Sequence, residues 1–255
     1  MIKNIVIILL LVFICGLFLK LNNKENFQSK IKIAVFCYNF GNFRNELKKK
    51  SIDRFNKDDR FDYYFYTDQN DITSEKWKII NVPLRQRTPH MNANRVTAKY
   101  YKWKIIPDEI KKYDYILHID CAKIEWLNKF TYDNIIDLIK NNPNVLFFAR
   151  KQPKHNNIYE EAGSNWHRGQ VDDTEYGDNA DRWIQKLKNE KFVQKFTHVE
   201  TGLYLKKNNK KLNSILTYIY DKLMDQELCR DQHVFPYVLQ KKGLKLSEFL
   251  IYNKF

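Results

Sequence analysis

The sequence predicts an α/β fold, in which a mainly parallel central sheet is flanked by helices and preceded by one N-terminal transmembrane helix. Over the first 150 residues, short apolar segments of strand character alternate with segments of helical spacing, which is the order that parallel strands with crossover helices require. The apolar segments are nearly continuous, as strands covered on both faces should be. The third observation is a long apolar run close to the N-terminus.

The N-terminal run, residues 5–19, contains fifteen uninterrupted apolar residues, and Leu21 extends it past Lys20. It is short for a membrane span, but lysines at its ends can snorkel toward the interface. We therefore expect residues 1–21 to form a signal anchor and 22–30 a polar stalk, in a single-pass membrane protein of type II. Lysines on both sides leave the orientation open under the positive-inside rule. A cleaved signal peptide is the alternative, although no small-x-small cleavage site follows.

Residues 31–255 are expected to form one domain. Strands that share one sheet are predicted near 31–37, 62–67, 78–82, 114–119 and 145–149, and a later strand at 197–207. Helices are predicted at 44–55, 94–107, 131–142, 180–192, 212–224 and 229–243. The segment 154–179 is polar and loop-like.

The net charge of +14 raises the question of a nucleic-acid partner. The basic residues are scattered, however, and the densest runs, 46–50 and 205–211, lack the interleaved aromatic side chains of a base-stacking surface. We therefore expect a solvated basic surface and no nucleic-acid partner. The same charge suits anionic phosphate groups, and the cysteines have no metal-binding spacing.

Polar side chains follow three of the predicted strands: Asn39, Asp68 and Asp120. Because the carboxyl ends of parallel strands share one edge of the sheet, these groups can converge on a ligand. Asp68 suits the hydroxyl groups of a ribose or the imide of a base. Asp120 can help to hold a divalent cation that bridges a diphosphate, because hard cations take oxygen ligands. The simpler alternative is that Asp120 caps the next turn.

The residues that follow Asp120 bear on this metal prediction. Enzymes that use nucleotide sugars commonly hold Mn²⁺ or Mg²⁺ with Asp-x-Asp, whereas Cys121 and Ala122 follow here, so the second acid is missing. A metal ion would have to recruit another group, or the protein works without one.

Two basic residues, Arg95 and Lys99, lie four positions apart on the helix before the Asp120 strand. At this spacing they present two cations on one helix face, which suits a pyrophosphate. The alternative is an ordinary solvated helix face.

Three further acids are candidates for a general base: Glu160, Glu161 and Asp231. A base for glycosyl transfer must lie within hydrogen-bond reach of the attacking hydroxyl group. Asp231 opens a predicted helix, where an acid can also be a simple N-cap. Three histidines are candidate metal or phosphate ligands, although a histidine taken singly is more often an ordinary polar residue: His155, His198 and His233.

Several segments occur in the order and spacing of a known family: 95–123, 149–162, 202–208 and 229–239. They resemble a glycosyltransferase-like family of plant proteins of turgor regulation and mucilage synthesis, formerly a domain of unknown function. The resemblance covers residues 31–245 and implies a GT-A-like, Rossmann-like fold. The family tends to follow its strand-end Asp with Gly-Lys, whereas this chain has Cys121-Ala122-Lys123, which places the lysine one position later.

The resemblance implies that residues 31–255 form a catalytic domain that moves a sugar from a nucleotide-sugar donor to a hydroxyl group of a glycan, protein or lipid. Asp120 is then the acid that places the donor diphosphate, with Asp68, Arg95, Lys99 and Lys123 as further donor-binding residues. Glu160, Glu161 and Asp231 compete for the acceptor side. Two alternatives from other classes are a non-catalytic glycan- or nucleotide-binding relative and a nucleotidyltransferase on the same fold.

Overall fold

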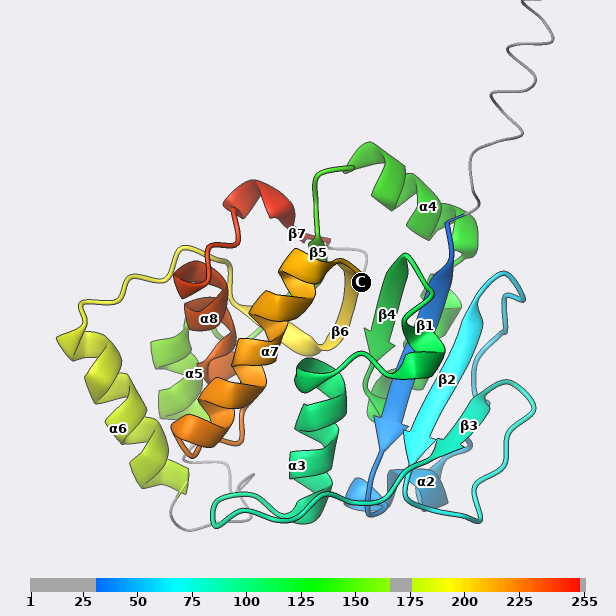
Figure 1. Cartoon of the computed structure of the whole chain (residues 1–255), viewed down its shortest axis with the longest axis horizontal. Coiled ribbons are helices and arrows are strands. Elements are labelled where there is room, and N and C mark those ends of the chain that lie inside the picture. The colour runs from blue at the N-terminus through cyan, green and yellow to red at the C-terminus, as the bar shows by residue number, and fades with distance from the viewer. Residues whose placement is uncertain (1–30, 166–175, 253–255) are drawn as a thin grey trace, which may run out of the picture. The chain divides into compact units, whose positions relative to one another are not determined.

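The computed structural model describes residues 31–165 and 176–252, and Figure 1 shows the chain. The predicted anchor (1–21) and stalk (22–30) lie outside the described residues. Within the described part of the chain, no helix is both long enough and apolar enough for a membrane crossing.

A seven-stranded mixed sheet forms the centre of the domain, with the strand order β3-β2-β1-β4-β6-β5-β7. The strands are β1 (Ile33–Asn39), β2 (Asp62–Thr67), β3 (Lys78–Asn81), β4 (Tyr115–Ile119), β5 (Phe147–Lys151), β6 (Val199–Lys207) and β7 (Phe249–Ile251). Strands β1, β2, β3 and β4 pair in parallel with their neighbours, and so do β5 and β7. β6 runs antiparallel between β4 and β5. The prediction that the first five strands share one mainly parallel sheet is confirmed.

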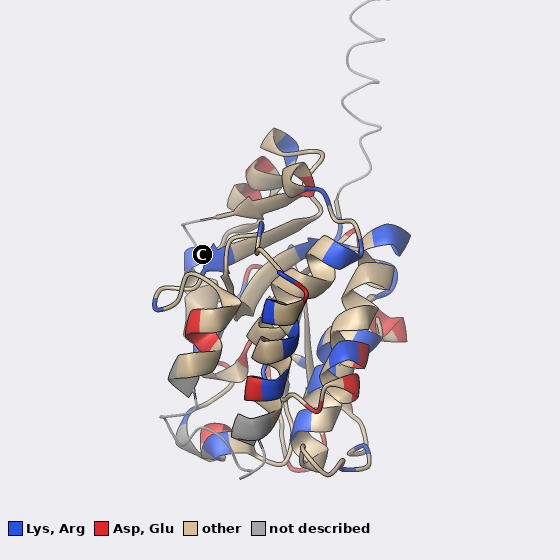
Figure 2. Cartoon of the chain, turned by 90° about the vertical axis from the view of Figure 1, so that its left-hand side faces the viewer, with Lys and Arg blue, Asp and Glu red and all other residues tan. Residues whose placement is uncertain are grey.

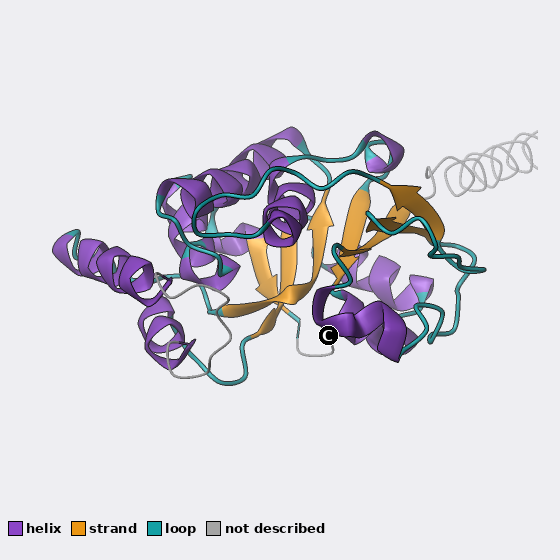
Figure 3. Cartoon of the chain, turned by 90° about the horizontal axis from the view of Figure 1, so that it is seen from below, coloured by secondary structure: helices purple, strands orange, loops and turns teal. Residues whose placement is uncertain are grey.

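The two central strands are buried, as their apolar sequences predict. In β1, Val35 is fully buried, and it is paired with Leu117 of β4, which is fully buried too. His118 is the polar exception in β4 and is also fully buried. Figure 3 shows why both faces are covered, since helices lie on both sides of the sheet. Burial of apolar side chains on two faces is what a parallel sheet needs for stability.

The helices are α2 (Glu46–Lys49), α3 (Ala93–Lys99), α4 (Tyr132–Asn141), α5 (Ile158–Asn165), α6 (Tyr176–Asn189), α7 (Lys210–Asp225) and α8 (Phe235–Lys241). α3 continues as one turn of π-helix, Tyr100–Lys104, and short 3₁₀ helices include Cys121–Lys129 and Asp231–His233. The main core gathers aromatic side chains such as Trp103, Trp183 and Phe235. Figure 2 shows lysines and arginines spread over the helices and interspersed with acids.

The predicted helix 44–55 is wrong except for one turn, because only Glu46–Lys49 is α-helical. Arg44 and Asn45 adopt left-handed backbone angles, with φ of 58° and 56°. Farther along, Ile52 and Phe55 are buried, and the Trp77 indole donates a hydrogen bond of 2.9 Å to the Ile52 carbonyl. This tertiary packing overrides the helical propensity of the segment.

Candidate functional site

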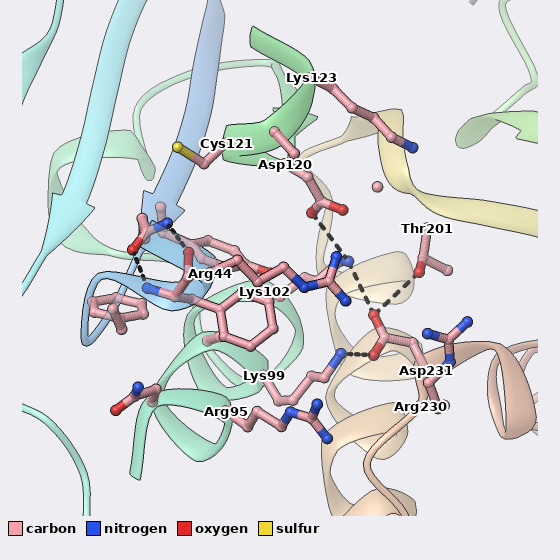
Figure 4. A pocket seen from close by; sticks show the side chains of 18 of the residues that line it. Arg44, Arg95, Lys99, Lys102, Asp120, Cys121, Lys123, Thr201, Arg230 and Asp231 are labelled. Atoms are coloured by element: carbon pink, nitrogen blue, oxygen red, sulfur yellow. Dashed lines mark hydrogen bonds and ion pairs between the residues drawn. The ribbon is translucent and has the colours of Figure 1, made fainter. Parts of the chain in front are cut away.

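A cleft of about 370 Å³ lies at the carboxyl ends of β1 and β4. Asn39 ends β1 and Asp120 follows β4, so the parallel pairing brings both to the same edge of the sheet. Because β6 is antiparallel, its first residues, 200–202, reach this edge as well. Helix α3 and the 3₁₀ helix at Asp231 complete the lining (Figure 4). The volume lies within the range of small-molecule sites.

Asp120 presents its carboxylate to the cleft and is 40% exposed there. Its backbone N–H donates a 2.8 Å hydrogen bond to the carbonyl of Gly202, which fixes the chain at this point. Oδ1 lies 3.2 Å from Nε2 of His118. Asp120 occupies the N-cap position of the 3₁₀ helix that follows, but its side chain makes no capping hydrogen bond. The capping alternative therefore does not describe its side chain.

Gly202 lies where the Asp120 carboxylate packs against β6. A Cβ at this position would clash with the Asp120 carboxylate and would also crowd the Lys123 ammonium. The absence of a side chain lets the carboxylate lie against the strand backbone. Gly202 therefore helps to set the position of the acid in the cleft.

Asp231 lies deep in the cleft and is only 1% exposed. Oδ2 lies 3.0 Å from Nζ of Lys102 and accepts a 3.2 Å hydrogen bond from the Thr201 hydroxyl, while Oδ1 is paired with Lys99. Burial alone would raise the pKa of Asp231, but the Lys102 and Lys99 ammonium groups outweigh it and hold the pKa well below its usual range. Asp120 and Asp231 thus approach one cleft.

Three basic residues of the α3 segment line the cleft: Arg95, Lys99 and Lys102. Arg95 is placed by the N-cap of α3, where Asn92 accepts a 3.0 Å hydrogen bond from its backbone N–H, and its Nη1 lies 3.2 Å from the Cys229 sulfur. Lys102 was missed by the sequence analysis. Its position could have been predicted from the spacing i, i+4, i+7 that it forms with Arg95 and Lys99, because these positions share one face of a helix. The π-helical turn at this point is a feature common at functional sites.

Lys123 lines the cleft beside Asp120 and pairs with Glu200 of β6. Burial lowers the pKa of Lys123 to about 8, despite the nearby Asp120 carboxylate. The other oxygen of Glu200 accepts a 3.1 Å hydrogen bond from Arg150. Glu200 and Thr201 are further cleft residues that the sequence analysis did not single out, because their positions depend on the antiparallel placement of β6.

Asp68 and Glu160 lie outside the cleft lining. Asp68 accepts a 2.7 Å hydrogen bond from the backbone N–H of Gly41, which has a φ of +61°, so its side chain shapes the loop after β1. Glu160 lies at the exposed start of α5 and accepts hydrogen bonds from Asn156 and Asn157. Both side chains are engaged in local structure, and their donor and acceptor roles stay predictions.

Glu161 lies behind the cleft, where it is 1% exposed and accepts a 2.7 Å hydrogen bond from Arg230. Two of the candidate histidines surround it, with Nε2 of His198 at 3.5 Å and Nε2 of His155 at 3.9 Å. Arg230 itself lines the cleft. The structure thus gives Glu161 a positioning contact with a cleft arginine, and its role as a base stays a prediction.

His233, the third candidate histidine, is fully buried in the 3₁₀ helix that Asp231 opens. Burial lowers the pKa of His233 to about 3, and the charge of Arg230 acts in the same direction. The ring is therefore neutral at neutral pH. Its role as a metal or phosphate ligand stays a prediction.

The residues around Asp120 do not fit a divalent cation. In the part of the chain that the structure describes, no cluster of three or more His, Cys, Asp or Glu side chains could hold a metal ion. The two carboxylates that face one another in the cleft, Asp120 and Asp231, are paired with lysine ammonium groups instead (Figure 4).

No family model and no curated protein matches the chain. The similar solved structures include the bifunctional glycosyltransferase WbbM in its apo form, which is 12% identical with a TM-score of 0.45 over 88% of this chain and 39% of that one. They also include core-mannan synthase A (CmsA/Ktr4) from Aspergillus fumigatus in its Mn/GDP form, 10% identical with a TM-score of 0.49 over 89% of this chain and 74% of that one. A third is a glycosyltransferase involved in the glycosylation of the major capsid of PBCV-1. It is 11% identical, with a TM-score of 0.41 over 87% of this chain and 81% of that one.

The chain therefore spans about two fifths of the length of WbbM. At these identities and TM-scores, the similarity does not assign an activity, a donor or an acceptor to this chain. The resemblance to the plant family stays a prediction.

Proposed function

We propose that this protein is a GT-A-type glycosyltransferase, which moves a sugar from a nucleotide-sugar donor to a hydroxyl group of a glycan, protein or lipid. The observation that carries the proposal is the cleft itself: basic side chains from four separate segments surround two carboxylates, Asp120 and Asp231, at the edge where parallel strands end. Open α/β sheets bind nucleotides at this edge. The cations are Arg44, Arg95, Lys99, Lys102, Lys123 and Arg230.

The cations suit the diphosphate of a nucleotide sugar. Lys99 and Lys102 come from one helix segment and Lys123 from the segment after β4, so a diphosphate between them would be contacted from two sides. Charge-assisted hydrogen bonds to phosphate oxygens are among the stronger polar contacts in proteins. The same groups stabilise the negative charge that develops on the leaving diphosphate as the sugar bond breaks.

In the reaction, the bond between the anomeric carbon and the phosphate oxygen breaks and the nucleoside diphosphate leaves with the electron pair. The acceptor hydroxyl oxygen forms the new bond to the anomeric carbon, and its proton passes to a carboxylate of the cleft. We assign this carboxylate to Asp231. A bound diphosphate places its negative charge beside Lys99 and Lys102, which offsets part of their effect on Asp231 and raises its pKa toward that of a useful base.

We also propose that residues 1–21 anchor this domain to a membrane as a single-pass protein of type II. The support is the uninterrupted apolar run of residues 5–19. The cleft would then work next to a membrane, where lipid-linked and membrane-bound acceptors are found.

A thermal-shift screen of the full-length chain against sugar nucleotides and nucleoside diphosphates tests the donor assignment. A ligand at a hundredfold excess over its Kd stabilises the folded state by about 2.7 kcal/mol, so we expect one donor and its nucleoside diphosphate to raise the Tm by about 5 °C or more. Consumption of that donor separates an enzyme from a binding relative. If no member of the panel raises the Tm, the proposed function is wrong.

A further inference from the structure

We infer that this protein binds the diphosphate of its donor without a divalent metal ion, with the ammonium group of Lys102 in the place of the metal. The inference rests on the proposed function, because it concerns how the same cleft holds a nucleoside diphosphate. It answers the question raised by the missing second acid after Asp120. Asp120 would then place the diphosphate through the ammonium group of Lys102, not through a bound metal ion.

The position of Lys102 carries the inference. Its Nζ lies 3.0 Å from Oδ2 of Asp231 and 3.8 Å from Oδ1 of Asp120, so one ammonium group bridges the two carboxylates that face one another in the cleft (Figure 4). The Lys102 side chain is 4% exposed, although the residue lines the cleft. A cation held between two acids at the end of a central strand is the arrangement that a metal-dependent site would show.

The carboxylates around this point already have ammonium partners. Asp231 pairs with Lys99 as well as with Lys102, and Glu200 pairs with Lys123. A divalent cation would have to displace these ammonium groups and then find further oxygen or nitrogen ligands. The diphosphate and water could supply such ligands, but Lys102 already engages both cleft carboxylates, so the arrangement of these side chains favours the ammonium over a metal ion.

An ammonium group can take over the metal's task at a diphosphate. It carries three donors, of which one is directed at Asp231, so it can still donate to phosphate oxygens. Lysine is a strongly hydrated point charge that binds phosphate without fixed geometry. The backbone at this residue is held by tertiary contact, since the Lys102 carbonyl accepts a hydrogen bond of 3.4 Å from the buried Tyr204 hydroxyl.

The test is calorimetric titration of the full-length chain with UDP, GDP, CDP, ADP and dTDP, once with excess EDTA and once with excess Mn²⁺. We expect at least one of these nucleotides to bind in EDTA, with a Kd within about threefold of that in Mn²⁺, because the cation is part of the chain. Binding that requires Mn²⁺ would overturn the inference and leave the proposed function standing. If none of the nucleotides binds under either condition, the proposed function fails and the inference fails with it.

A matched pair of variants tests Lys102 itself, again in EDTA. Lys102→Met keeps the length of the side chain and removes the charge, so we expect the Kd to rise about tenfold or more. Lys104→Met is the control, because Lys104 lies in the same π-helical turn but pairs with Asp221 at the surface, and its Kd should stay unchanged. Circular dichroism monitors the fold of both variants. Unchanged binding in Lys102→Met would overturn the inference, whether or not the variant is destabilised.

Discussion

Asp231→Asn is expected to lower the free energy of unfolding by about 3–5 kcal/mol, the usual cost of removing one partner from a buried ion pair. Asp231 is 1% exposed and is the partner of both Lys99 and Lys102, which are 17% and 4% exposed. Without its charge, two ammonium groups would share a poorly hydrated space. The measurement is equilibrium unfolding in urea, compared with the unmodified chain.

The control for this variant is Asp221→Asn. Asp221 pairs with Lys104 at 2.5 Å, but the two side chains are 42% and 34% exposed, so the loss should stay below about 1 kcal/mol. Equal losses for the two variants would mean that the cleft pairs are worth no more than a surface pair. In a transferase assay, Asp231→Asn should also lower turnover by about 10² to 10⁴, the range for a missing general base.

Gly202→Ala is expected to remove most of the nucleotide binding while the domain stays folded. The added Cβ would clash with the Asp120 carboxylate and crowd Lys123, so at least one of these groups must leave its place in the cleft. Both are the ends of flexible side chains that can shift at little cost in stability, but displacement of a charged contact should weaken binding about tenfold or more. Calorimetric titration with the best-binding nucleoside diphosphate measures the effect.

Gly163→Ala is the matched control for this substitution. Gly163 is an exposed residue of α5, and a Cβ added there meets nothing within 4 Å. Alanine in a helix should leave binding unchanged and stabilise the chain by about 0.5–1 kcal/mol. If Gly202→Ala binds nucleotide as tightly as Gly163→Ala does, then the position of Asp120 against β6 does not matter for the donor.

Strands β1, β2 and β4 were predictable because each is a short and nearly continuous apolar segment, typical of a strand covered on both faces. β1 and β4 are central, parallel and buried, as their apolar runs indicate. The position of β6 was not predictable from its sequence, because antiparallel pairing between β4 and β5 depends on contacts far apart along the chain. β7 is only three residues long, too short for any periodicity to reveal.

The site was predictable where topology alone places a residue. Asp120 follows a central parallel strand, so its place at the sheet edge follows from the fold. Asp68 follows a strand too, but its carboxylate is engaged by the Gly41 backbone, and sequence spacing does not show such a contact. Glu160 and Glu161 are adjacent residues of one type, and the burial and partners that separate them depend on tertiary packing. Lys102 follows the helical spacing of Arg95 and Lys99, but its place between two acids depends on the approach of a late segment of the chain.

The central claim is that the cleft transfers a sugar by breaking the bond between its anomeric carbon and the donor diphosphate. The most direct measurement is ³¹P NMR of the phosphorus products after the full-length chain has consumed its preferred sugar nucleotide, with the Asp120→Asn variant alongside. We predict that the nucleoside diphosphate accumulates with the unmodified chain and forms far more slowly with the variant, because Asp120 holds the cation that contacts the diphosphate. A nucleoside monophosphate and a sugar phosphate as products would contradict the claim, because they show cleavage between the two phosphates instead.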